Sequence, residues 1–568
     1  MLHKEFVIGF ILTMSLLWPL FQAQYSTYHD SVQVIRLFEM DKCIRDGQIP
    51  CRWVPDLGGE YGYPLFNFYA PLPYYYGEIF YKLTGSLLIS SKIMFASAFV
   101  LSYIFMFLLG RKLWGEKGGA ISAIFFSFAP YHASLFYVRG AMGELWGVMF
   151  YPLILWSIFR LKEKQSVLNI LLVALSIGGV LVTHNLSALM FLPVIAGFIL
   201  MLAWQDGGWK FWKKTFFIFV ILSAVLGLSL ASFYWVPALT EKNLVHVDTT
   251  TYGYFHYTEH FKGLRKLFAQ RFWGWGASVF EVNGRTDGMA FQVGWVHVLG
   301  WALGLFAAYK LWWKDRKISI YVIFFTLSTA FGIFMVNPKS LFIWDALDFL
   351  KYVQFSWRFL GIVIFAISVV AGSIILAIPN KISNRVWIGL VFLVVVLNFY
   401  YFRPEKFIST TDKELLTGKE WDAQIKRSIF DYLPIYAVEP PAALTATRYE
   451  VLTGEVNITN WQQGTNWFNF KANASSHTIV RIAQYYFPNW IILVDNQEVS
   501  IDYQNHLGLM TIILGTGSHT VEGRLYDSPV RALTNRLSGL SAILVFILLL
   551  FQIPKIRKWS LYYLRRID

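Results

Sequence analysis

The chain has 568 residues, of which 56% are hydrophobic, 18% aromatic and only 15% charged. Its mean hydropathy is +0.47, and a soluble domain with that balance would expose too much apolar surface. The composition therefore predicts an integral membrane protein. The formal net charge of +14 does not indicate nucleic acid as a partner, because membrane proteins collect basic residues in their cytoplasmic turns.

Twelve apolar runs are long enough to cross a bilayer as helices. They cover residues 5–23, 89–110, 118–134, 143–159, 167–183, 186–203, 215–236, 292–311, 318–336, 357–379, 386–402 and 533–553. The first run also fits a cleaved signal peptide, but its length and the lack of an A-x-A site after it favour a retained anchor.

Lysine and arginine set the orientation, because the turns that hold most of them belong in the cytoplasm. We therefore expect a multi-pass protein of the plasma membrane with both termini cytoplasmic and its active face outside. Three stretches then lie outside, namely residues 24–88, 237–291 and 403–532. The predicted units are a transmembrane domain, an extracytoplasmic β-rich domain, and a last helix with a basic cytoplasmic tail, at residues 1–402, 403–532 and 533–568. Arg531 and Arg536 lie at the outside end of the last helix, contrary to this preference, but they follow a long translocated domain, where the preference is weak.

The first outside stretch predicts two elements. Residues 34–45 mix apolar and charged positions in the pattern of a helix that lies on the membrane surface. The tyrosine-rich and proline-rich residues 65–76 suit a membrane-edge or partly re-entrant element. The two cysteines of the chain, Cys43 and Cys51, also lie here, and they are either bridged in an oxidising compartment or a pair of unpaired buried thiols.

The other two outside stretches differ in character. Residues 237–291 are rich in aromatic rings and bases, which suits a loop that covers a cavity. Residues 403–532 contain β-branched and alternating runs, as at 478–483 and 510–514, separated by Asn, Asp and Gly turns. This pattern predicts a β-sandwich of roughly 90 to 110 residues.

Ionisable residues at the outer ends of helices are functional candidates, because charge is expensive in hydrocarbon. Asp30 follows the first span, although with Gln33 it also fits a helix-capping box. Glu144 follows a very short outside turn, where its alternative role is that of a partner for Arg139.

Two further candidates follow along the chain. His184 lies in the next short outside turn, where its alternative role is to cap a helix. Arg358 lies at the outer mouth of an apolar helix, where an anionic head group or phosphate would offset its cost; the alternative is snorkelling to the interface. The topology brings Asp30, Glu144 and His184 to one membrane level.

These residues also carry a resemblance to a known family. The first outside loop has an early acidic residue and a G-Y-P-L-F-N-F-Y-x-P-L-P-Y-Y segment at residues 62–75, and a later outside turn reads R-G-A-x-x-E at 139–144. An H-N turn follows at 184–185 and a Q-F-x-W-R-F-L segment at 354–360. The set resembles the membrane proteins labelled 6-pyruvoyl-tetrahydropterin synthase-related, which look like relatives of the GT-C superfamily of polyprenyl-phosphate-dependent glycosyltransferases.

This sequence departs from the family pattern at one position and extends the resemblance in one further segment. Ser356 stands where a familiar form of the last segment has proline. The pterin label gains no support, since a short membrane-rich match is no pterin site. Residues 485–495 also look like the β-domain of large bacterial membrane proteins of the same superfamily. The implied fold is a GT-C-like polytopic α-helical membrane protein, with about twelve transmembrane helices and a C-terminal extracytoplasmic β-sandwich domain.

The GT-C resemblance implies an inverting transfer of a hexose or pentose from a polyprenyl-phosphate donor to a cell-surface acceptor. Asp30 would be the general base and Arg358 a cation that balances the leaving phosphate. The implied partners are the lipid-linked sugar, membrane lipid and a glycan, lipid or protein acceptor; a divalent metal stays open, since some members use one. The predicted substrate-binding residues are His29, Glu60, Tyr63, Asn67, Arg139, Glu144, His184, His256 and Arg358.

Two other functions fit the same sequence. One is a non-catalytic scaffold whose β-domain binds a glycan. The other is a transporter or flippase for a lipid-linked substrate. A transporter should carry polar residues at mid-membrane, and these helices have almost none, which favours chemistry at the surface.

Overall fold

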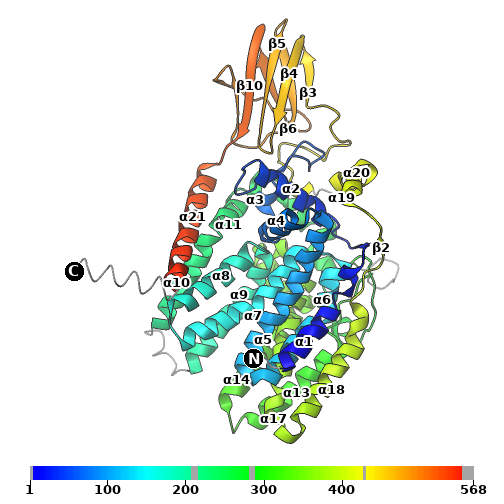
Figure 1. Ribbon diagram of the computed structural model, residues 1–568, viewed down its shortest axis with the longest axis vertical. Coiled ribbons are helices and arrows are strands. Elements are labelled where there is room, and N and C mark those ends of the chain that lie inside the picture. The colour runs from blue at the N-terminus through cyan, green and yellow to red at the C-terminus, as the bar shows by residue number, and fades with distance from the viewer. Residues whose placement is uncertain (1–3, 206–214, 280–287, 427–429, 553–568) are drawn as a thin grey trace, which may run out of the picture.

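The computed structural model describes residues 4–205, 215–279, 288–426 and 430–552. A helical body carries a β-sandwich at one end, and the first outside loop lies between them (Figure 1). The prediction of a polytopic α-helical membrane protein with a C-terminal β-domain is confirmed. The predicted basic tail at residues 553–568 lies outside the described residues.

Seven apolar helical segments are at least 18 residues long, enough to cross a membrane. They are α5 (Leu87–Ser127), α7 (Met142–Glu163), α9 (Asn185–Gln205), α14 (Arg316–Val336), the segment Ser356–Ala377 with α16 (Leu360–Gly372) and α17 (Ile374–Ala377), the segment Asn380–Tyr401 with α18 (Asn380–Asn398), and α21 (Pro529–Leu550). The helices α10 (Thr215–Leu230) and α11 (Ser232–Thr240) form an eighth span if counted together, with a 72° bend. Two shorter apolar helices are α8 (Val167–Leu181) and α13 (Trp295–Leu311).

Helix α5 contains two of the predicted spans. Gly115 has φ 75° and ψ −177°, which interrupts the helix. A Cβ added at Gly110 would lie 3.0 Å from Cα of Gly119, whereas a straight helix would separate these residues by about 13 Å. The chain therefore turns back at Gly115, and the two halves pack side by side, as the separate predicted spans require.

A helix lies at each of the twelve predicted positions, but the predicted number of spans is not confirmed, because seven or at most eight segments of the described residues are long enough to cross a membrane. The first helix is shorter than expected. Helix α1 covers Lys4–Ser15, and a 3-10 turn, η1, covers Trp18–Phe21. Pro19 has no N–H to continue an α-helix. The predicted span of residues 5–23 is therefore not one continuous helix.

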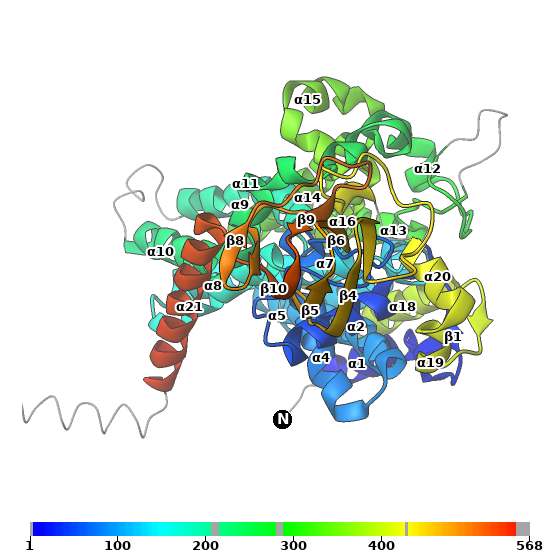
Figure 2. The same cartoon turned by 90° about the horizontal axis from the view of Figure 1, so that it is seen from above.

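A helix forms at the position predicted for a surface helix, but it does not lie on the surface of the protein. Helix α2 (Gln33–Arg45) lies between the helical body and the β-sandwich (Figures 1 and 2). Its charged residues Arg36, Glu39 and Asp41 are all buried. The amphipathic pattern therefore marks a helix covered by protein on its charged side as well. Cys43 and Cys51, near its C-terminal end, form a disulfide.

The remaining elements of the outside stretches are short. The tyrosine-rich segment forms α3 (Leu65–Phe68) and α4 (Leu72–Thr84). The second stretch contains 3-10 turns and α12 (Leu264–Phe268), and α15 (Leu341–Ala346) lies between α14 and α16. Residues 403–448 contain β2 (Phe407–Ile408), α19 (Asp412–Leu415) and α20 (Gly418–Lys426), and β2 pairs with β1 (Tyr25–Ser26).

The β-sandwich begins at Tyr449, later than the predicted boundary at residue 403. One sheet has the strand order β4-β5-β10-β7-β8 and the other β3-β6-β9. Buried residues of both sheets, including Phe470, Val480 and Ile512, share one core. The strands are β3 (Tyr449–Thr453), β4 (Val456–Gln463), β5 (Trp467–Ala474), β6 (Thr478–Tyr485), β7 (Trp490–Val494), β8 (Gln497–Val499), β9 (Leu509–Leu514) and β10 (Gly517–Leu525).

A buried polar network ties the last helix to the first outside loop. Arg531 on α21 donates from Nε to Oε2 of Glu241 at 2.8 Å, and Asn67 Nδ2 donates to the same oxygen at 2.9 Å. Arg52 donates to Asn67 Oδ1 at 2.8 Å and to Asn535 Oδ1 at 2.7 Å. This pairing explains how Arg531 can be buried near the start of α21, since a buried charge is stable only when it is paired.

We predict that Arg531→Ala destabilises the protein by about 3 to 5 kcal/mol, because it leaves the Glu241 carboxylate buried without its cation. Exposed Arg536 on the same helix is the matched control, and Arg536→Ala should change stability by less than about 0.5 kcal/mol. Thermal unfolding in detergent, followed by tryptophan fluorescence, measures both. Equal midpoints for the two variants would contradict the role of the network.

Candidate active site

The segment after η1 is held against the turn that precedes α7. The backbone N–H groups of His29 and Asp30 donate to the carbonyls of Val138 and Arg139 at 3.0 and 2.9 Å. Gly140 follows with φ 62°. A Cβ there would lie 2.3 Å from the ring of Tyr28, so the close approach of the two segments requires glycine. Asp30 is thereby fixed beside the R-G-A-x-x-E turn.

Hydrogen bonds hold the Asp30 carboxylate through one of its two oxygens. Its Oδ2 accepts from Gln33 Nε2 at 2.7 Å and from Arg36 Nη1 at 3.2 Å. The Asp30 side chain is 32% exposed, whereas that of Arg36 is 4% exposed. Within the described residues, Oδ1 has no hydrogen-bond partner. The carboxylate therefore presents one oxygen to solvent and anchors the other.

The capping role considered for Asp30 is wrong. Helix α2 begins at Gln33 with Val32 as its N-cap, and no side chain caps it. Gln33 instead uses its amide to hold Asp30, and Tyr74 donates to Gln33 Oε1 at 2.5 Å. Residues 30, 33 and 36 thus act together because their spacing places them along one side of the helix start.

Glu144 is the second carboxylate and is 2% exposed. Its Oε1 accepts from Tyr131 at 2.6 Å, and its Oε2 accepts from Arg139 Nη1 at 2.7 Å. The Nε of Arg358 lies 3.3 Å from the same Oε2. The pairing with Arg139 that the sequence offered as a structural role is present, and Arg358 joins it.

The two arginines of this cluster stand against aromatic rings. The guanidinium of Arg139 lies 4.5 Å from the ring centroid of Trp357, and that of Arg358 lies 4.7 Å from Phe355. Their side chains keep 11% and 10% of their surface exposed. Both guanidinium groups are therefore largely shielded from water but keep a small exposed surface. A cation that is shielded from water attracts an anion more strongly.

Tyr69 connects the two carboxylate clusters. Arg36 stacks over its ring at 4.1 Å. Loss of hydration raises the pKa of Tyr69, while the positive charges of Arg36 and Arg358 oppose that rise. A Cβ added at Gly143, directly before Glu144, would lie 3.9 Å from Tyr69 Oη. Tyr69 thus lies against Arg36 and beside the turn that carries Glu144, so Asp30 and Arg358 belong to the same polar layer.

His184 completes this layer. Its Nδ1 accepts from the backbone N–H of Ser187 at 3.1 Å, at the start of α9. Loss of hydration and the nearby charge on Arg358 lower the pKa of His184 to about 3. The imidazole is therefore neutral at pH 7, and the helix-capping role is present.

The charge balance of the layer favours an anion. Two carboxylates, those of Asp30 and Glu144, lie beside three guanidinium groups, those of Arg36, Arg139 and Arg358. Together these groups carry one net positive charge. A phosphate that accepts from the remaining guanidinium N–H groups would balance it. The layer thus combines an excess of positive charge with a partly exposed carboxylate.

The other predicted site residues do not share this layer equally. His29 is exposed, and its Nε2 lies 2.6 Å from the carbonyl oxygen of Trp275, so the second outside stretch lies next to Asp30. Asn67 is fully buried in the network with Arg52 and Glu241. Its surroundings are therefore those of a structural residue and not of a substrate contact.

Three more predicted residues have partners elsewhere. Glu60 accepts from Trp421 Nε1 at 2.7 Å. Tyr63 is buried with its ring 6.5 Å from that of Tyr432. His256 Nδ1 lies 2.6 Å from Thr258 Oγ1. In the described part of the chain, none of their hydrogen bonds reaches Asp30 or Arg358.

Sequence reasoning missed several members of the layer. Arg36 was assigned to the polar face of a surface helix, although its spacing from Asp30 and Gln33 was a usable signal. Tyr131 and Trp357 carry no signal of their own, because aromatic residues are abundant in every apolar run. Tyr69 was part of the tyrosine-rich motif but had no individual role.

The possibility of a divalent metal was tested against the residues present. The described residues bring together no group of three or more His, Cys, Asp or Glu side chains that could hold an ion. Gln33 and Arg36 offer N–H donors to Asp30, and such donors do not ligate a cation. The residues around Asp30 therefore do not form a metal site.

Part of the chain is similar to a family of known chemistry. The family described as Dolichyl-phosphate-mannose-protein mannosyltransferase matches residues 69–235, a stretch that includes Arg139, Glu144 and His184. A protein of Lactococcus lactis subsp. cremoris (strain MG1363), described as "Uncharacterized protein", is 23% identical over 242 residues. That match covers 41% of this chain and 39% of the relative.

Solved structures show weaker likeness. ArnT from Cupriavidus metallidurans bound to undecaprenyl phosphate has a TM-score of 0.40 and 11% identity, with 68% of this chain and 63% of ArnT covered. AglB from Archaeoglobus fulgidus, in complex with an inhibitory peptide and a dolichol-phosphate, has a TM-score of 0.40 and 13% identity, with 70% and 54% covered. TM-scores of this size are too low to assign a shared fold.

Proposed function

We propose that the protein is a membrane glycosyltransferase of the GT-C type, which transfers a sugar from a polyprenyl-phosphate donor to an acceptor hydroxyl. The observation that carries the proposal is the shared polar layer of Asp30 and the arginines. The reaction needs a carboxylate with an oxygen free to accept a proton, and positive charge that stabilises the leaving phosphate. The family match over residues 69–235 supports a lipid-phosphate sugar as donor.

The arginines would receive the phosphate of the donor. Arg139 and Arg358 are already fixed by Glu144, and each retains N–H groups beyond those that hold it. Fixed donors stabilise a developing negative charge without reorganising during the reaction. The cluster therefore suits a phosphate that gains charge as the sugar leaves.

Asp30 would act as the general base. The acceptor oxygen attacks the anomeric carbon, the bond from that carbon to the phosphate oxygen breaks, and the lipid phosphate leaves with the electron pair. The hydroxyl proton passes to Oδ1 of Asp30, while Gln33 and Arg36 keep Oδ2 in place. A single displacement inverts the anomeric configuration. The acceptor belongs to a cell-surface glycan, lipid or protein.

We predict that Asp30→Asn lowers sugar transfer by about a hundred-fold to ten-thousand-fold, because the amide cannot accept the proton. The amide keeps the size of the carboxylate and still accepts from Gln33, so the protein should insert and fold. Loss of the charge facing Arg36 should cost about 1 to 3 kcal/mol of stability. Transfer from a radiolabelled lipid-linked sugar in membranes measures the first effect, and thermal unfolding measures the second.

Asp422→Asn is the control for Asp30→Asn. It neutralises an exposed aspartate of helix α20, and no described hydrogen bond joins Asp422 to Asp30 or Arg358. This variant should transfer sugar at close to the wild-type rate. Near wild-type transfer by Asp30→Asn would remove the catalytic role of Asp30.

The proposal places the polar layer outside the cytoplasm, at the plasma membrane, with both termini inside. Cysteines at Gly263 and Gly515, where an added Cβ meets no atom within 4 Å, should label on intact cells with an impermeant maleimide. Exposed Lys164 is the internal control, and a cysteine there should label only after permeabilisation. Both native cysteines are in a disulfide, so they should not react with the maleimide. The reverse labelling pattern would invert the topology.

A further inference from the structure

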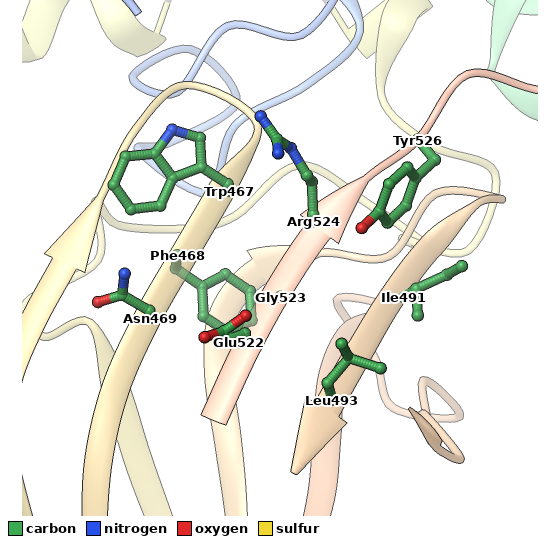
Figure 3. A pocket seen from close by; sticks show the side chains of 9 residues that line it. All are labelled: Trp467, Phe468, Asn469, Ile491, Leu493, Glu522, Gly523, Arg524 and Tyr526. Atoms are coloured by element: carbon green, nitrogen blue, oxygen red, sulfur yellow. The ribbon is translucent and has the colours of Figure 1, made fainter. Parts of the chain in front are cut away.

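The outward face of the five-stranded sheet differs from an ordinary solvated face. A hollow of about 250 Å³ lies over β5, β10 and β7 (Figure 3). Alternation along a strand should place polar residues on the face away from the core. Here the outward positions include Trp467, Ile491 and Leu493, and Tyr526 follows directly after β10.

The register arranges these side chains in two rows across the sheet. One row is Trp467, Arg524 and Ile491, and the next is Asn469, Glu522 and Leu493. Each row thus has a charged side chain on the central strand, β10, with an aliphatic side chain on β7. Figure 3 shows the rings of Trp467 and Tyr526 on either side of Arg524.

This chemistry matches a carbohydrate. A sugar ring has apolar C–H faces that pack on aromatic rings, and hydroxyl groups at its rim that need donors and acceptors. Arg524 supplies donors, Glu522 supplies acceptors, and Asn469 supplies both. Glu522 and Arg524 are exposed, and Asn469 is half-buried. The hollow is close to the lower end of the volume of ligand sites, which suits a short stretch of an oligosaccharide.

The hollow has a fixed relation to the catalytic layer. Asp46, directly after α2, accepts from Trp467 Nε1 at 2.9 Å and from Thr465 N–H and Oγ1 at 2.7 Å each. Asp30 lies just before the other end of α2. A helix of 13 residues is about 20 Å long. The sheet face and the proposed base are therefore held at opposite ends of one buried helix.

We infer that this sheet face binds an oligosaccharide and serves as a distal subsite for the acceptor glycan. The separation along α2 means that an extended glycan, and not a single sugar, would be needed to engage both places. The acceptor role rests on the proposed function, whereas binding of an oligosaccharide does not.

The binding test uses full-length protein in detergent, titrated with cellohexaose, chitohexaose and mannohexaose by calorimetry. At least one of the three should bind, and Arg524→Ala should weaken that binding by about tenfold, the expected loss for hydrogen bonds to a charged group. Lys471→Ala is the matched control, because Lys471 is exposed on β5 but does not line the hollow; it should bind as the wild type does. Binding of none of the three, or equal binding by the two variants, would overturn the site.

A transfer assay on the same variants separates the two proposals. With an extended acceptor, Arg524→Ala should raise the KM for the acceptor and leave donor binding unchanged. Loss of oligosaccharide binding with an unchanged KM would overturn the acceptor role and leave the proposed function intact. Wild-type transfer by Asp30→Asn would overturn the proposed function, while the oligosaccharide titration would still decide the sheet site.

Discussion

The buried carboxylate of Glu144 holds the proposed active site together. Its two oxygens bind Tyr131, Arg139 and Arg358. Tyr131 and Arg139 come from the segment just before Glu144, whereas Arg358 lies far along the sequence. Two cations near one another repel, and the carboxylate between Arg139 and Arg358 offsets that repulsion. Arg358 also donates to the carbonyl of Val353 and to Gln354 Oε1. Removal of that charge from a nearly dry site would leave both cations uncompensated. The anion site, and with it the geometry facing Asp30, depends on this one side chain.

Helix α2 has a comparable role for the molecule as a whole. Asp30 lies before its N-terminal end, where its backbone N–H donates to the carbonyl of Arg139. Asp46 lies directly after its C-terminal end, where its carboxylate accepts from Thr465 and Trp467. The helix is short, but it is buried and joined to Cys51 through the disulfide of Cys43. The membrane helices, the first outside loop and the β-sandwich are thus coupled through this helix, which explains why its charged residues Arg36, Glu39 and Asp41 are buried.

The sequence predicted the apolar helices and the β-sandwich well, because long apolar runs and period-two alternation are local signals. It failed for α2, since an amphipathic pattern does not reveal whether lipid, water or protein covers the polar side. Asp30, Arg139, Glu144, His184 and Arg358 were predicted individually, and the structure brings them together. Arg36 was missed although its spacing from Asp30 and Gln33 was a usable signal, and Tyr131 was missed because aromatic residues are abundant in every apolar run. Asn67 fits a buried structural network instead.

The most direct test of the account is a structure of the protein with undecaprenyl phosphate bound. The account predicts that the phosphate oxygens lie within hydrogen-bonding distance, about 2.9 Å, of guanidinium nitrogens of Arg139 or Arg358. The Oδ1 atom of Asp30 should then face the side of the layer from which an acceptor approaches. A phosphate bound beyond the reach of these arginines, or at the cytoplasmic ends of the helices, would contradict the account.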